Sequence, residues 1–151
     1  MAPITTRPPG DIHDQNAVRA LLGDLEPQRA ILILAEEAGL ITGAATWLEP
    51  DAGPALLGNV VTTNNDRRTF YQLIRRCAQD AIDSSHDEAT FTLTDHALLA
   101  LVETQFTTAP EITGTDPATG APTAWRVTVD LRDAIRQLDR AIALLEDPTR
   151  A

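Results

Sequence analysis

The sequence contains no lysine, so all twelve of its basic residues are arginine, and it contains only one cysteine. A single cysteine, Cys77, excludes a disulfide within the chain and a zinc site built from thiolates. The three histidines, His13, His86 and His96, lie too far apart for metal-ligand spacing, so we expect no metal site.

Long apolar runs are also missing. No stretch approaches the roughly 18 apolar residues that a membrane-spanning helix needs, so no membrane partner is expected. The first nine residues, MAPITTRPP, lack the apolar centre of a signal peptide. The expected location is therefore the cytoplasm.

Acidic residues dominate the charge, with 22 aspartates and glutamates and a formal net charge of −10. This balance argues against nucleic acid as a general partner, because the phosphate backbone requires a basic face. It suits a cationic substrate such as a small amine, although acidity also serves solubility alone. The length of 151 residues suits a single domain, 1–151, with a substantial core.

Apolar periodicity and turn residues divide the chain into alternating strands and helices. The resulting order, β-α-ββ-β-α-β-α-ββ-α, predicts a mixed α/β layer architecture around a sheet of about seven strands, flanked by helices. Gly43, inside a predicted strand, indicates a bulge or a close approach of another backbone. The strands are expected at 4–7, 30–37, 40–48, 55–62, 89–94, 107–113 and 123–130, and the helices from Asp11 to near Pro27, at 67–83, at 96–105 and at about 131–146.

The last helix carries an apolar stripe with alternating steps of four and three residues, over two heptads. Two interpretations remain open: the helix packs on its own sheet as an appendage of the domain, or the stripe forms a homodimer contact. The stripe consists of Leu131, Ile135, Leu138, Ile142 and Leu145.

The segment VVTTNNDRRTFYQLIRR, residues 60–76, passes from a strand directly into a helix. Such turns often hold phosphate, because free backbone N–H groups point outward at a helix N-terminus. Phosphate loops at these turns are usually rich in glycine, and this one has none. Arg67 and Arg68 can bind an anion through their side chains instead; the alternative is an exposed helix face.

Several segments resemble the GNAT N-acetyltransferase superfamily, over residues 3 to about 131. ILILAEEAGLITGAATWLEP is similar to its second and third strands, and LLGNVVTTNNDRRTFYQLIRRCAQDA to its fourth strand and acyl-CoA-binding helix. ATFTLTDHALLALVETQF resembles its fifth strand and the helix that follows, and APTAWRVTVDL its last strand.

The resemblance implies transfer of an acetyl group from acetyl-CoA, or another acyl group from its CoA thioester, to an amine. It implies that the pantetheine arm lies along Val60, Val61 and Thr62. The pyrophosphate loop would then span residues 65–70. The binding candidates in that loop are Asn65, Arg67, Arg68, Thr69 and Phe70.

This sequence departs from the family pattern at two places. Both glycines of the loop Q/R-x-x-G-x-G/A are missing, and a side chain there is expected to block or reshape the backbone cradle. The usual general-acid tyrosine before Gly-Phe is also absent, since Val102 falls near its place and Gly-Phe reads Gln105-Phe106.

Three residues are candidates for proton transfer. His96 follows the fifth strand, where the fold opens toward its substrate, and can accept a proton from an ammonium group. Asp95 beside it can do the same. Their alternatives are a polar first-turn residue for His96 and a helix N-cap for Asp95. Tyr71 is either a displaced general acid or a packing residue.

Two functions therefore remain open. The first is an acyl-CoA-dependent N-acetyltransferase acting on a small amine, which predicts saturable acetyl-CoA binding that weakens when Arg67 and Arg68 are replaced by alanine. The second is a GNAT-fold protein without acetyltransferase activity, serving as a binding or regulatory module or catalysing another reaction. It predicts a cleft blocked by side chains such as Phe70 or Tyr71, and an open, V-shaped split between the fourth and fifth strands would count against it.

Overall fold

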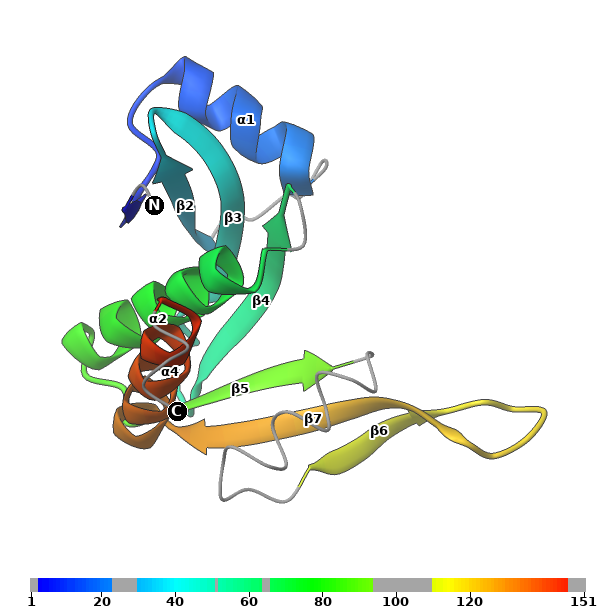
Figure 1. The fold of residues 1–151 in the computed structure, drawn as a ribbon. Coiled ribbons are helices and arrows are strands. Elements are labelled where there is room, and N and C mark those ends of the chain that lie inside the picture. The colour runs from blue at the N-terminus through cyan, green and yellow to red at the C-terminus, as the bar shows by residue number, and fades with distance from the viewer. Residues whose placement is uncertain (1–2, 23–29, 51, 64–65, 94–109, 147–151) are drawn as a thin grey trace.

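The computed structural model describes residues 3–22, 30–50, 52–63, 66–93 and 110–146 (Figure 1). Its elements in chain order are β1 (Ile4–Arg7), α1 (Ile12–Leu22), β2 (Ala30–Glu37), β3 (Leu40–Leu48), β4 (Ala55–Thr62), α2 (Arg67–Asp83), β5 (Glu88–Leu93), β6 (Glu111–Thr115), β7 (Pro122–Asp130) and α4 (Leu131–Glu146).

Most of the predicted elements are confirmed with nearly the same bounds. The main difference is β6, which runs from Glu111 to Thr115 rather than over 107–113. Residues 107–109 and the helix predicted at 96–105 lie outside the described residues. Within the described ranges, we find no helix with the length and hydrophobicity of a bilayer span.

The strands form one seven-stranded mixed sheet in the order β1-β2-β3-β4-β5-β7-β6. Its only parallel neighbours among the described strands are β4 and β5. A parallel pair needs a crossover connection, and α2 provides it. This architecture confirms the predicted mixed α/β fold class.

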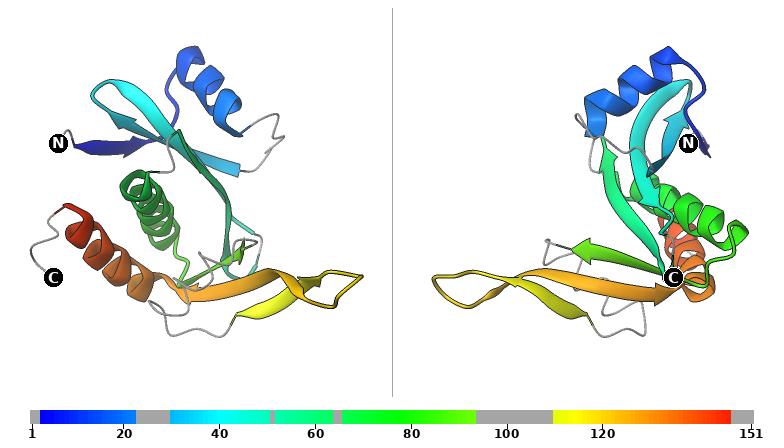
Figure 2. Two further views of the ribbon diagram at one scale, coloured as in Figure 1. Left: turned by 45° about the vertical axis from the view of Figure 1, so that its right-hand side comes forward. Right: turned by 180° about the vertical axis from the view of Figure 1, so that it is seen from behind.

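Helices cover both faces of the sheet around β3 (Figure 2). On one face, Ala45 and Trp47 of β3 pack with Leu73 of α2 in the largest apolar cluster. On the other face, Ala44 packs with Val18 of α1. Because β3 is buried on both faces, its sequence reads as a run of small and apolar residues rather than a strict alternation.

The C-terminal helix α4 packs against α2. Leu138 and Ile142 contact Tyr71 of α2, and Leu131 joins the largest cluster. An ion pair between Arg75 and Asp139 also connects the two helices, with 2.5 Å between Nε and Oδ1. The apolar stripe thus packs within the chain, as the first of its two interpretations predicted, but mainly on a helix rather than on the sheet. A homodimer stays a prediction.

A charged cluster joins the N-terminal segment to the sheet. Arg7 donates to both oxygens of Asp14, at 2.6 and 3.1 Å, and to Glu36 at 2.9 Å. The backbone N–H of Gly10 also donates to Asp14, at 2.8 Å. The hydrogen bonds from Arg7, and then that from Gly10, lower the pKa of Asp14 from 3.8 to about 2.

This depressed pKa predicts acid sensitivity. A carboxyl whose pKa is lower in the folded state stabilises the fold above its unfolded pKa, and this contribution disappears as the pH falls through the folded pKa. We therefore expect Asp14→Asn to be less stable than wild type at neutral pH, with the difference shrinking as the pH falls from about 4 to about 2.

Urea unfolding followed by circular dichroism over this pH range measures the effect. The exposed Asp87 provides the matched control Asp87→Asn. A stability difference between wild type and Asp14→Asn that does not change with pH would contradict the prediction.

Candidate functional site

The neighbouring strands β4 and β5 pair over a short length only. Ala55 is opposite Ala89 and Leu56 is opposite Thr90, and the strands diverge after these two pairs (Figure 1). Among the described residues, β4 from Leu57 onward therefore has no strand partner on the β5 side. The result is a V-shaped split between the fourth and fifth strands of the sheet.

The backbone of β4 presents polar groups to this split. Thr63 donates its N–H to the carbonyl oxygen of Thr42 at 2.9 Å, so the backbone of Thr63 faces β3. In an antiparallel ladder the direction alternates from residue to residue. The N–H and C=O groups of Val61 thus also face β3, whereas those of Val60 and Thr62 point toward β5 and the split.

A bulge in β4 lies just before these residues. Leu57 is opposite Trp47 and Val60 is opposite Ala45, so Gly58 and Asn59 together oppose the single residue Thr46. A Cβ at position 58 would lie 2.2 Å from Oγ1 of Thr46, which leaves room only for glycine. A bulge bends its strand and increases the local twist. Here it lies where β4 separates from β5.

The side chains of the predicted pantetheine residues lie on both faces of the sheet. Val60 is opposite Ala45 and packs on the largest apolar cluster, below α2. Val61 is opposite Ala44, on the α1 face. Val60, Val61 and Thr62 are all partly buried. Contact with pantetheine stays a prediction for all three.

The helix N-terminus after β4 is capped by a carboxylate. Asp66 accepts the backbone N–H of Arg68 at 3.1 Å and the hydroxyl of Thr69 at 2.7 Å. Thr69 is fully buried, so its hydroxyl serves the cap. The capping carboxylate satisfies one of the free N–H groups and places a negative charge where a phosphate would bind.

The structure separates the two neighbouring arginines of this turn. Arg68 is 9% exposed, and its Nη2 donates to Oε1 of Glu37, at the end of β2, at 3.3 Å. Arg67 is exposed. Across the ranges described above, Arg67 forms no ion pair with another side chain. Its guanidinium is therefore an exposed cation at the start of α2, in the first turn after β4.

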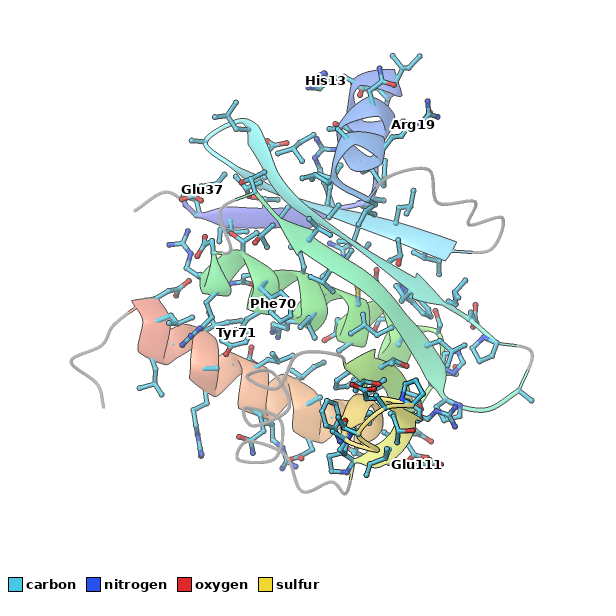
Figure 3. All side chains as sticks on the ribbon, turned by 90° about the vertical axis from the view of Figure 1, so that its right-hand side faces the viewer. His13, Arg19, Glu37, Phe70, Tyr71 and Glu111 are labelled. Carbon is cyan, nitrogen blue, oxygen red and sulfur yellow. The ribbon has the colours of Figure 1, made fainter. Side chains whose placement is uncertain are left out.

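Phe70 and Tyr71 belong to the contact between the two helices. Tyr71 is 6% exposed and packs with Leu138 and Ile142, and Phe70 packs at the edge of the same cluster (Figure 3). Burial raises the pKa of Tyr71, and the positive charge of Arg67 opposes this shift. Both side chains thus contact α4, and the catalytic role of Tyr71 stays a prediction.

The other site predictions fall outside the described residues. They concern Asn65 in the turn, and Asp95 and His96 after β5. Their roles also stay predictions.

A small apolar cavity lies between α2, α4 and the point where β4 and β5 separate. Its volume is about 40 Å³, and none of the described side chains that line it is charged. Cys77 lines it, and burial raises the pKa of this thiol to about 12, so the thiol stays protonated at neutral pH. The lining residues are Trp47, Ala55, Leu57, Ile74, Cys77, Ala78, Ala81, Ala89, Phe91, Val129, Leu131 and Ala134.

Sequence reasoning missed two features of this region. It did not identify Glu37 as the partner of Arg68, since no sequence signal connects residues 31 positions apart. It also missed the cavity, although the small residues Cys77, Ala78 and Ala81 on the inner face of α2 were a usable signal.

Comparison with solved structures identifies the architecture. A GNAT family acetyltransferase from Elizabethkingia anophelis with acetyl-CoA bound is similar at a TM-score of 0.63 and 15% identity, over 84% of this chain and 97% of that one. The ribosomal-protein-S18-alanine N-acetyltransferase from Escherichia coli is similar at a TM-score of 0.63 and 13% identity, over 85% and 94% of the two chains.

A third structure, the N-acyl amino acid synthase FeeM from uncultured soil microbes, has a TM-score of 0.66 and 10% identity, over 91% of this chain and 96% of that one. No protein-family model matches the sequence, and no curated protein matches it. At these identities the likeness concerns the fold. The chain has the GNAT fold, as its sequence resemblance indicated.

Proposed function

We propose that this chain with the GNAT fold is an acyl-CoA-dependent N-acyltransferase that acts on a small amine. The observation that carries the proposal is the edge of β4 beyond Leu56, which has no strand partner on the β5 side among the described residues and where the backbone groups of Val60 and Thr62 point into the split. Two of the similar structures are acetyltransferases by description, and one of these holds acetyl-CoA.

The residues of the split fit the pantetheine and thioester end of an acyl-CoA. An extended β4 edge offers alternating N–H and C=O groups, which is the pattern that the amides of a pantetheine arm can pair with. The side chains of Phe70 and Tyr71 pack toward α4, so the structure does not show the blockage by these residues that the alternative function predicts.

The pyrophosphate end fits only in part. Asp66 caps the helix, and its carboxylate occupies the N–H of Arg68 that a glycine-rich loop would offer to phosphate. Side-chain charge must therefore replace backbone amides. The exposed Arg67, in the first turn of α2, is the group that we assign to this contact.

An acyl-CoA supplies a thioester whose carbonyl carbon accepts the nitrogen of an amine; a C–N bond forms, the C–S bond breaks, and the thiol leaves with the proton that the amine loses. The N–H groups on the free edge of β4 stabilise the negative charge that develops on the carbonyl oxygen. The split holds the two reactants in position. The net charge of −10 favours approach of a cationic amine.

The alternative is a GNAT-fold protein that has lost the transfer reaction. Two observations favour it: the carboxylate of Asp66 at the helix N-terminus, and the burial of Arg68 against Glu37. Both weaken the phosphate site without affecting the split. Measuring whether the protein binds CoA and acetyl-CoA, and whether it releases thiol from acetyl-CoA, therefore distinguishes the two functions.

Calorimetry with acetyl-CoA and with CoA tests the proposal. We expect saturable binding of both, a thermal shift with either, and release of free thiol when acetyl-CoA is incubated with a panel of small amines. Absence of both heat and thermal shift at millimolar ligand would overturn the transferase function. Binding without thiol release over the amine panel would support the alternative.

A further inference from the structure

We propose that the apolar cavity at the base of the split holds the acyl group of the donor. The protein would then prefer a short acyl group of about four carbons, such as butyryl, over acetyl. This inference rests on the proposed function and names its donor class.

The cavity lies at the base of the split between β4 and β5. Leu56 and Thr90 form the last pair between β4 and β5. The next residue of each strand, Leu57 on β4 and Phe91 on β5, lines the cavity. The cavity therefore begins where strand pairing ends, at the base of the split. An acyl chain that extends from a thioester held at the edge of β4 would enter it there.

The described walls of the cavity are apolar. Most lining side chains are aliphatic or aromatic, including Leu57, Ile74 and Phe91. The thiol of Cys77 is protonated, and the indole N–H of Trp47 has no acceptor among the residues that the structure describes. None of the described wall residues carries a positive charge to neutralise a carboxylate, so we expect dicarboxylic acyl groups such as succinyl to be excluded.

The volume of the cavity limits the length of the acyl group that it can hold. One water-sized atom occupies about 10–15 Å³. A volume of about 40 Å³ therefore holds about three non-hydrogen atoms. With the carbonyl carbon in the split, three further carbons make a butyryl group. The small side chains of Ala78 and Ala134 leave this space open.

Dissociation constants measured by calorimetry for CoA, acetyl-CoA, butyryl-CoA and octanoyl-CoA test the inference. Burial of two further methylenes predicts that butyryl-CoA binds about tenfold more tightly than acetyl-CoA. Octanoyl-CoA should bind no more tightly than butyryl-CoA, because the cavity is then full. In Trp125→Phe, which leaves Trp47 as the only tryptophan, butyryl-CoA should change the fluorescence more than CoA does.

Ala78→Leu fills the cavity, so the butyryl preference should disappear while the affinity for CoA stays at the wild-type value. Ala20→Leu, on the exposed face of α1, is the matched control and should keep the preference. If Ala78→Leu does not fold, the smaller change Ala134→Val replaces it, since Ala134 lines the same cavity from α4.

The outcomes separate the two proposals. Equal affinities for acetyl-CoA and butyryl-CoA in the wild type, or an unchanged preference in Ala78→Leu, would overturn the acyl-chain inference and leave the proposed function standing. Failure of CoA and of every acyl-CoA to bind would overturn the proposed function, and the inference with it.

Discussion

Replacing Gly43 with alanine is expected to lower the free energy of unfolding by about 1–3 kcal/mol, because the core has no space for a methyl group there. A Cβ at this position would lie 2.9 Å from Cδ1 of Leu73, 2.9 Å from the carbonyl oxygen of Val61 and 3.2 Å from Cγ2 of Thr69. Leu73 can move, but the carbonyl oxygen belongs to the β3–β4 ladder and cannot move without disturbing it.

The neighbours of Gly43 connect stability to the site. Val61 lies between the two β4 residues whose backbone groups face the split, and Thr69 belongs to the first turn of α2. A methyl group at position 43 pushes against both. We therefore expect Gly43→Ala to weaken acyl-CoA binding as well, even under conditions in which the variant is folded.

Urea unfolding of Gly43→Ala and wild type measures the loss of stability. Gly10→Ala is the matched control, because a Cβ there meets its nearest atom, Oδ2 of Asp14, at an ordinary 3.5 Å. Its expected effect is within about 0.5 kcal/mol. A Gly43→Ala variant as stable as wild type would contradict the close approach of α2 to β3.

The strands and helices near the site were predictable because local signals mark them. The strand over 30–37 begins with a continuous apolar run of six residues, AILILA, and Gly39 permits the tight turn after it with a φ of +82°. The start of α2 was marked by three adjacent capping residues at 64–66 and the apolar stripe behind them, and the structure uses Asp66 as the cap. The expectation that Gly43 marks a close approach or a bulge is also confirmed.

The divergence of β4 and β5 was not visible in their own residues. A strand that pairs over two residues reads like one that pairs over six, since its residue pattern does not encode the register with a distant partner. The split was expected only from the resemblance to a known fold. The cavity at the base of the split depends on how α4 packs over α2. The apolar stripe on α4 was compatible both with packing inside the chain and with a homodimer contact, so it did not predict this packing.

The different roles of the two neighbouring arginines also could not be predicted. Successive residues on a helix point about 100° apart, so Arg67 and Arg68 face different surroundings. Only the position of Glu37 at the end of β2 decides which of them turns inward. The sequence places both at the same turn, and the fold leaves one of them exposed.

Replacing Arg67 with alanine is therefore expected to weaken CoA and acetyl-CoA binding by about tenfold or more, because a charge-assisted hydrogen bond to phosphate is lost. The thermal stability of Arg67→Ala should stay close to that of wild type, since the Arg67 side chain is exposed and forms no ion pair within the described part of the chain. Arg68→Ala should instead lower the stability, because it leaves Glu37 without a buried partner.

Calorimetry at two salt concentrations distinguishes a phosphate contact from a general effect of charge. Wild-type affinity should fall as salt rises, and Arg67→Ala should lose part of this dependence. The control is Arg132→Ala, which removes another exposed arginine from the first turn of α4. Since α2 and α4 run antiparallel, with Tyr71 near Ile142 and Leu131 near Cys77, Arg132 lies at the far end of α2. Equal losses of affinity in both variants would refute a specific role for Arg67 and leave only the net charge as the cause.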